Sequence, residues 1–358
     1  MNISEIRQTE MPESTTRYLK ENEYAFSLPR QSDKFFTKPR ALRRPTIGNI
    51  LKDRLVQVTV GVLRYFYAVS REFGHIQHLS ALKSIKRGKR ALVLGNGPSL
   101  GYLNEERFRK FQESGGEVFS VNNWSSTHLS SVTPDYLVIS DGASLVDPDS
   151  SMGELLSNDV KEKQALLKAF LNEHKQVKIV CPLVRVKELA KQFGKERIMG
   201  FVDHEMRAIS SNIDPRFPRG YVSLTLFKAL AIAIYMGYEE IFLLGMDNTF
   251  PRDTFCDSHN TIYRLERHAG GKDSIFDQSS YYPSMDVWAQ DLLDLFSDLH
   301  RCFNGHQIIN LDPFSLTDVF RKIDDLGSFD SALGIGEKFP TESVHMKAHS
   351  ASRINVGV

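Results

Sequence analysis

A short glycine-containing loop, Gly95 to Ser99, has residue types suited to binding a phosphate or a sugar. Gly95 and Gly97 permit backbone angles that other residues avoid, and they let the main chain approach a ligand closely. Free backbone N–H groups in such a loop suit phosphate, and the Asn96 amide can both donate and accept hydrogen bonds. Pro98 fixes the exit of the loop, and Ser99 can cap the following turn. The same residues also suit a tight strand-to-helix turn that binds nothing.

Two common phosphate-binding motifs are excluded by the residues that follow this loop. Position 100 is Leu, so the loop is not Gly-x-Gly-x-x-Gly, and no Gly-Lys-Ser/Thr follows, so it is not a P-loop. A third motif, Asp147-Pro148-Asp149, has the Asp-x-Asp pattern with which many sugar transferases bind a divalent ion. No apolar strand directly precedes it, so we interpret it as an exposed turn and predict no metal site.

Polar residues follow four further apolar runs of the chain. They are Asn122 and Asn123, Asp141, Asp247 with Asn248, and Asn310 to Ser315. In open parallel sheets, ligands bind outside the carboxyl ends of the strands, near the point where the strand order reverses. Five strand ends that carry Asn, Asp or Ser therefore predict one polar binding edge better than any single motif does.

The elements that position these residues alternate between strands and helices. Short apolar runs predict strands at 90–94, 117–121, 136–140, 177–181, 198–202, 240–244 and 306–310. Residues 224–236, apolar on almost every side, predict a buried helix that stops at Gly237, and residues 287–303 predict an amphipathic helix. This order predicts an α/β fold: a Rossmann-like, mostly parallel sheet with helices on both faces.

Four regions follow from the composition along the chain. Residues 1–45 are polar and end in a basic stretch, and we expect an irregular segment there. Residues 46–88 predict a helical extension, 89–330 the Rossmann-like domain with a variable lid at about 248–282, and 331–358 a C-terminal tail. The extension either packs on the main domain, contacts another subunit, or attaches to an anionic membrane surface through residues 34–70.

The bulk composition places the chain among ordinary globular proteins. It has 358 residues, 41% hydrophobic residues and a net charge of +1, which gives no reason to expect nucleic acid as a partner. Cys181, Cys256 and Cys302 are too far apart for a disulfide framework or a zinc site. The first residues lack a secretory signal pattern. We therefore expect a cytoplasmic protein, at most peripheral to the inner face of the membrane.

Several of these segments resemble a known family. Val93 to Leu100 and Val121 to Trp124 resemble the bacterial sialyltransferases, and Ala231 to Asp247 is similar to the helix–strand unit of those enzymes. Ile309 to Phe320 resembles a related branch, frequent among polysaccharide-assembly proteins and named after the archaeal 6-hydroxymethylpterin diphosphokinase. The resemblance covers roughly residues 89–322.

The resemblance implies a glycosyltransferase whose donor is a cytidine-monophosphate (CMP) sugar. The sugar would be sialic acid or another 2-keto acid sugar, passed to a glycan acceptor by inverting displacement without a required cofactor. Asn96 and Asn122 would hold the ribose and phosphate region, and Ser223 or Thr225 the sugar carboxylate, favoured by the helix N-terminus. The complete predicted donor site is Gly95, Asn96, Gly97, Pro98, Ser99, Asn122, Asn123, Asp141, Ser223, Thr225, Asp247 and Ser315.

The resemblance also implies that the lid supplies a histidine as general base. The lid contains His259 and His268, and the family spacing favours His268. An imidazole with a pKa near ~6.5 is well suited to taking a proton from an acceptor hydroxyl. Tyr263 of the lid would steady the leaving phosphate.

Two other functions remain open at this point. A diphosphokinase would require Mg²⁺ near Asp141 and Asp247 to neutralise the transferred phosphates. A protein with this fold but without catalysis, such as an assembly subunit, would need neither. The acceptor and the oligomeric state, including a homo-oligomer, are not determined by the sequence.

Overall fold

The computed structural model describes most of the central part of the chain. The described residues are 55–141, 158–206, 210–247, 253–256, 262–266, 274–277 and 285–335, with gaps at 57, 61, 64, 68, 71–73, 75, 77 and 78. The Asp147–Asp149 motif, most of the predicted lid with His259 and His268, and the C-terminal residues from 336 onward lie outside this set.

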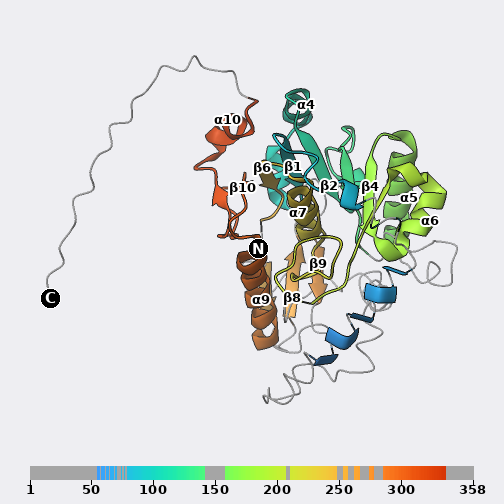
Figure 1. Ribbon diagram of the computed structural model, residues 1–358. Helices are drawn as coiled ribbons and strands as arrows, with labels where there is room; N and C mark the ends of the chain where they lie inside the picture. Colours follow the sequence, from blue (N-terminus) through green and yellow to red (C-terminus); the bar gives the residue numbers. More distant parts are fainter. Residues whose placement is uncertain are drawn as a thin grey trace, which may run out of the picture.

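An eight-stranded sheet forms the centre of the molecule (Figure 1). Its strand order is β11-β10-β6-β1-β2-β3-β4-β5, and every neighbouring pair is parallel. The strands are β1 (Arg90–Leu94), β2 (Glu117–Val121), β3 (Tyr136–Val138), β4 (Lys178–Pro182), β5 (Ile198–Phe201), β6 (Glu240–Leu244), β10 (Ile308–Asn310) and β11 (Arg321–Lys322). The predicted parallel α/β sheet is confirmed.

Alternate residues of each strand point to opposite faces of the sheet, and both faces are buried. In β1, Leu92 and Leu94 belong to one hydrophobic cluster, whereas Ala91 and Val93 belong to the other. This is why the strand is apolar throughout instead of alternating with polar residues.

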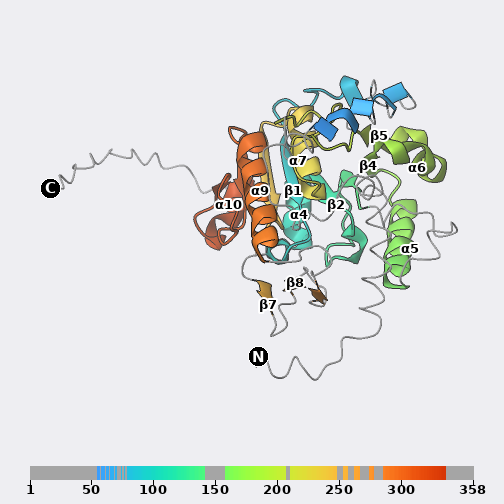
Figure 2. The ribbon, with the colours of Figure 1, turned by 90° about the horizontal axis from the view of Figure 1, so that it is seen from below.

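Helices cover both faces, as expected. The first face carries α4 (Glu105–Glu113), α5 (Asn158–Glu173), α6 (Val186–Phe193) and α10 (Phe329–Leu333). The second face carries α7 (Thr225–Met236) and α9 (Met285–Phe303) (Figure 2). Side chains of these two helices share one hydrophobic cluster. Of these helices, the sequence analysis located only α7 and α9.

Helix α7 is the most completely buried of the described helices. Nine of its residues are buried, because it lies across β1, β2 and β3 with further helices around it. It ends where Gly237 adopts a left-handed conformation with φ of 86° and donates its N–H to carbonyls of the last turn. A residue with a Cβ would be strained there, which explains the predicted stop.

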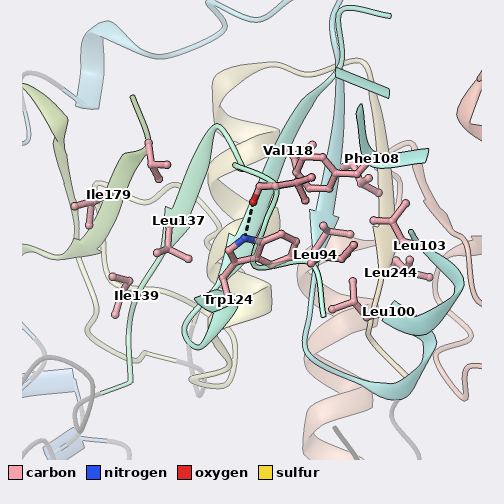
Figure 3. Close-up of a cluster of buried hydrophobic side chains, with 14 of the residues drawn as sticks. Leu94, Leu100, Leu103, Phe108, Val118, Trp124, Leu137, Ile139, Ile179 and Leu244 are labelled. Atoms are coloured by element: carbon pink, nitrogen blue, oxygen red, sulfur yellow. Dashed lines mark hydrogen bonds between the residues drawn. The ribbon is translucent and has the colours of Figure 1, made fainter. Parts of the chain in front are cut away.

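Trp124 anchors the segment that follows β2. Its side chain is fully buried, and its ring centroid lies 5.8 Å from that of Phe108 on α4. The indole Nε1 donates a hydrogen bond to the Val132 carbonyl oxygen at 3.2 Å, so the polar atom is satisfied inside the core (Figure 3). This anchor fixes the position of Asn122 and Asn123 at the end of β2.

A second, antiparallel sheet lies within the predicted lid (Figure 1). It consists of β7 (Thr254–Cys256), β8 (Ile262–Glu266) and β9 (Ser274–Asp277). Tyr263 lies on the central strand, opposite Phe255 and Asp277. The resemblance implies a variable lid here, and the sequence pattern predicts no strands in it.

Helical residues lie at both ends of the described region. Described residues between 55 and 81 are helical, and residues 82–88 form turns. Helix α10 crosses the predicted boundary at 330, and buried Phe329 and Leu333 attach it to the core. Among the described residues, no helix is both long and apolar enough to cross a bilayer.

Candidate functional site

The strand order reverses between β1 and β6. From β1 the chain proceeds outward through β2 to β5, with its crossover helices on the first face. After α7 it returns to β6 on the other side of β1 and continues to β10 through α9, on the second face. The carboxyl ends of β1 and β6 therefore form the switch point, where open α/β sheets bind ligands. These ends carry Gly95 to Ser99 and Gly245 to Asp247.

The loops after β1 and β6 cross in direct contact. A Cβ at Gly95 would lie 2.4 Å from the Gly245 carbonyl oxygen, and one at Gly245 would lie 2.3 Å from the Gly95 oxygen. A Cβ at Gly97 would lie 2.0 Å from Asp247 Oδ2. Gly245 also has φ of 76°, which favours glycine. The glycines are therefore explained by the contact between the two loops, with no need for a ligand.

Hydrogen bonds join the two loops. Gly95 and Gly97 donate their N–H groups to Leu244 and Gly245 oxygens at 2.8 and 3.1 Å. The Ser99 N–H donates to Asp247 Oδ1 at 2.9 Å, and its hydroxyl donates to Oδ2 at 3.1 Å. The expectation that these three N–H groups are free for phosphate is wrong, because β6 approaches closely enough to accept them. Ser99 likewise does not cap the turn that follows.

Asp247 carries an unusual carboxyl group. Burial, reinforced by the negative charge of Asp312, raises its pKa from near 3.8 to about 6, although hydrogen bonds from Ser99 act in the opposite direction. Burial and the same two carboxylates raise the pKa of Tyr102 in the short helix η2 (Pro98–Tyr102). Asp247, Asp312 and Tyr102 therefore lie close together beside the crossed loops. Tyr102 was not predicted, because its sequence position gives no sign of it.

A second polar cluster ties the ends of β2 and β3 to the start of α7. Asn122 Nδ2 donates to Thr225 Oγ1 at 2.9 Å, and Asn122 Oδ1 accepts from the N–H groups of Ser140 and Asp141 at 3.1 and 3.3 Å. The hydroxyls of Ser140 and Thr225 share a hydrogen bond of 2.7 Å. Asn122 adopts a left-handed backbone with φ of 42°, which Asn tolerates better than most residues. Ser140 was the member that the sequence analysis missed.

Asn96 and Asn123 retain polar groups that these clusters do not use. Asn96 Nδ2 donates to the Val121 carbonyl oxygen at 3.4 Å, but its Oδ1 is buried without a hydrogen-bond partner. Such a group is costly unless something donates to it. The partly exposed Asn123 has no side-chain hydrogen bond within the described part of the chain.

The N-terminus of α7 opens onto this edge without a side-chain cap. Leu224 is the N-cap residue and provides no side-chain hydrogen bond to the first turn. The Leu226 side chain touches the position of Gly95, so this helix end lies against the β1 loop. Exposed Ser223 accepts a hydrogen bond from Lys228 Nζ at 3.0 Å. The uncapped N–H groups give the edge a partial positive charge.

A buried charge cluster holds the segment between β5 and α7. Asp203 accepts from Lys228 Nζ at 2.8 Å and from Arg219 Nε at 3.0 Å, and Arg219 also pairs with Glu205. Although burial acts to raise the pKa of Asp203, the charges of Lys228 and Arg219 keep it below its usual range. Removing Asp203 would leave Lys228 as an unpaired buried charge, and the cluster ties Lys228 on α7 to the segment that precedes it.

Ser315 and Pro98 belong to neither of the two polar clusters. Ser315 is buried, and its hydroxyl donates to the Met246 carbonyl oxygen at 2.6 Å, which joins the loop after β10 to the end of β6. Pro98 is exposed as the first residue of η2. Nearby Asn310 is fully buried, and its Nδ2 has no hydrogen-bond partner.

The predicted site is therefore assembled in part. The structure brings most of the predicted donor-binding residues to one edge, from the ends of β1, β2, β3 and β6 and the start of α7. Tyr263 belongs to the separate sheet, and His268 and His259 lie outside the described residues. No cluster of three or more potential metal ligands occurs in the described part of the chain.

Comparisons with known proteins provide little guidance. No protein-family model matches the chain, and no curated protein matches it. Among solved structures, the Maf glycosyltransferase from Magnetospirillum magneticum AMB-1 is similar at 12% identity and a TM-score of 0.37. The match covers 72% of this chain and 41% of that one, so this chain spans about two fifths of its length. Similarity at this level establishes neither a shared fold nor a shared activity.

The contact between the two loops predicts that alanine destabilises the protein at Gly97 but not at nearby Gly101. Gly97→Ala places a methyl group 2.0 Å from Asp247 Oδ2 and 2.7 Å from the Gly245 oxygen, so we expect a loss of about 1–3 kcal/mol in the free energy of unfolding. Gly101→Ala is the matched control, because nothing lies within 4 Å of its Cβ position, and it should change stability by less than about 0.5 kcal/mol. Urea denaturation measures the free energy of unfolding of both variants. Equal losses in the two variants would contradict the contact between the loops after β1 and β6.

The raised pKa of the Asp247 carboxyl predicts that the free energy of unfolding depends on pH. Its carboxyl stays protonated in the folded state up to about pH 6 but ionises near 3.8 when unfolded, so its contribution is present below 3.8 and lost as pH rises through 6. Relative to Asp247→Asn, which does not titrate, wild type should lose about 1–2 kcal/mol between pH 4.5 and pH 7. Denaturant midpoints of the wild type and of Asp247→Asn at both pH values test this prediction. An equal change in the two proteins between the two pH values would refute it.

Proposed function

We propose that this chain is a glycosyltransferase that binds a nucleotide-activated sugar at the edge formed by the ends of β1, β2 and β3 and the start of α7. The distantly similar Magnetospirillum protein is also a glycosyltransferase, although at that level of similarity the agreement carries no argument. The proposal rests on the arrangement of the edge itself.

The observation that carries the proposal is the uncapped N-terminus of α7 beside an unsatisfied Asn96. Asn122 and Ser140 hold Thr225, so the first turn of α7 is fixed against the sheet. A helix N-terminus stabilises an anion through its free N–H groups and its dipole. The buried Asn96 Oδ1 requires a donor, which the hydroxyl of a ribose or sugar can supply. A nucleotide sugar combines an anionic phosphate with such hydroxyls.

The resemblance to the sialyltransferases supports a CMP-sugar as the donor. The sugar of such a donor carries a carboxylate, and the donor also carries the phosphate. We propose that Thr225, at the start of α7, or exposed Ser223, two residues before it, binds this carboxylate. Because the loop N–H groups of Gly95, Gly97 and Ser99 are already paired, the helix N-terminus is the better candidate for the anionic group.

The proposed reaction is a direct displacement with inversion. His268 takes the proton from an acceptor hydroxyl as that oxygen attacks the anomeric carbon. The bond from this carbon to the phosphate oxygen breaks, and CMP leaves with the electron pair. Tyr263 is proposed to steady the departing phosphate. This scheme needs no metal, because CMP leaves with a single phosphate group.

The carboxylates near the crossed loops favour one alternative, a Mg²⁺-dependent diphosphokinase. Asp247 and Asp312 lie close enough for each charge to resist the other, and a divalent cation would relieve that repulsion. Ser99 already occupies both oxygens of Asp247, which makes this the weaker proposal. A third candidate, an assembly protein without catalysis, would bind no nucleotide.

A nucleotide screen separates the three functions. Thermal unfolding of the full chain is measured with CMP, CDP, UDP, GDP and ATP, each with and without Mg²⁺. The transferase proposal predicts stabilisation by CMP without metal, because a ligand that binds only the folded state lowers its free energy and so raises the unfolding midpoint. Stabilisation by ATP only with Mg²⁺ would favour the diphosphokinase, and no shift with any nucleotide would favour the assembly protein.

Asn96→Ala tests whether the loop after β1 belongs to the nucleotide site. Loss of this side chain should weaken CMP binding by about 1–3 kcal/mol, measured by titration calorimetry. Asn304→Ala is the matched control, because Asn304 is exposed just after α9, at the opposite edge of the sheet. Unchanged affinity in Asn96→Ala would mean that the loop has only a structural role.

His268→Ala tests the proposed general base. We expect turnover of a CMP-sugar to fall by about 10²–10⁴ while CMP affinity stays nearly constant. His259→Ala, the other lid histidine, should retain most of the activity. A full rate in His268→Ala would remove this residue from the mechanism, and loss of activity in His259→Ala alone would transfer the role to that histidine.

A further inference from the structure

The N-terminal helical segment exposes an apolar face. Leu55, Val62, Leu63 and Phe66 are 68%, 37%, 64% and 63% exposed, and all four are helical. At 3.6 residues per turn, these positions lie along one side of a helix. Contiguous exposed apolar side chains of this size are unusual on a protein surface unless something covers them.

The other side of the same segment packs on the main domain. The Tyr65 ring centroid lies 6.0 Å from that of Phe217, and Arg216 Nη1 donates to Ser80 Oγ at 3.3 Å. Tyr65 and Ile76 are only partly exposed. The apolar face is therefore not the side that attaches the segment to the domain, and its exposure is not explained by that contact.

The part of the sequence that contains this face is strongly basic. Residues 34–89 contain thirteen Lys and Arg residues and only two acidic residues, Asp53 and Glu72. The whole chain has 45 basic and 44 acidic residues, so the remainder of the chain is net negative. Among the described residues, Lys83 and Arg87 are exposed on either side of Ile85, which is itself 51% exposed. Lys86 and Lys89 are neutralised locally, since both pair with Glu117.

We propose that the face formed by Leu55, Val62, Leu63 and Phe66 docks on the surface of an anionic lipid bilayer. An apolar helix face in a basic segment of the chain matches the boundary between acyl chains and acidic headgroups. A protein partner would have to supply an acidic surface with an apolar centre, whereas an anionic bilayer provides both features over any area. The proposal is independent of the glycosyltransferase proposal, since it involves none of the residues at the strand edge.

Vesicle co-sedimentation of the full chain tests the proposal. We expect binding to phosphatidylcholine vesicles that contain phosphatidylglycerol, little binding to pure phosphatidylcholine, and weaker binding as salt increases. The double variant Leu63→Gln/Phe66→Gln should lower the partition coefficient by at least about tenfold. Lys83→Gln/Arg87→Gln should lower it by about fivefold per charge. Leu166→Gln/Leu293→Gln removes two exposed apolar side chains elsewhere, on α5 and α9, and should bind like wild type.

Several results would overturn the proposal. The proposal is overturned if the wild type does not bind the anionic vesicles. It is also overturned if the Leu63→Gln/Phe66→Gln variant binds them as well as the wild type does. Equilibrium sedimentation provides the last comparison. A wild-type dimer that this variant converts to a monomer, without vesicle binding by either protein, would show that the face is covered by a second copy of the chain. Thermal unfolding confirms that each variant is folded.

Discussion

The crossing of the loops after β1 and β6 is the constraint on which the candidate site depends. Three glycines allow the two backbones to touch, and the Ser99–Asp247 hydrogen bonds hold them there. Because β1 and β6 are neighbours at the centre of the sheet, this contact sets the edge from which the rest of the site is built. Any side chain at Gly95, Gly97 or Gly245 would separate the loops and the strands behind them.

The crossing also determines which groups are left for a ligand. It uses the loop N–H groups and the Asp247 carboxylate, and the neighbouring cluster uses both polar atoms of Asn122. The groups that remain are the Asn96 oxygen, Asn123 and the first turn of α7. Polar residues at a strand end can thus either join neighbouring elements or bind a ligand. In this protein several of the polar strand-end residues join neighbouring elements.

The segment before β1 differs from the central domain in its charge and in the exposure of its apolar side chains. Residues 34–89 concentrate positive charge on a chain that is nearly neutral overall, and the described helical part packs on the domain with one side only. Its exposed apolar side has no part in holding the sheet together. The central domain and this segment are thus shaped by different requirements: a close-packed core in one case and a surface in the other.

The sequence by itself determined the parallel α/β architecture, because buried strands and a buried helix such as α7 leave local apolar patterns. It also located the polar strand ends, since these follow directly after such runs. It could not decide that β6 returns beside β1, and therefore could not show that Asp247 binds Ser99, 148 positions away. Nor could it find Ser140 and Tyr102, or the pairing of Lys228 with Asp203, because those contacts join segments that only the completed sheet brings together. Hydrogen bonds between distant segments depend on the strand order, and the strand order is a property of the folded chain as a whole.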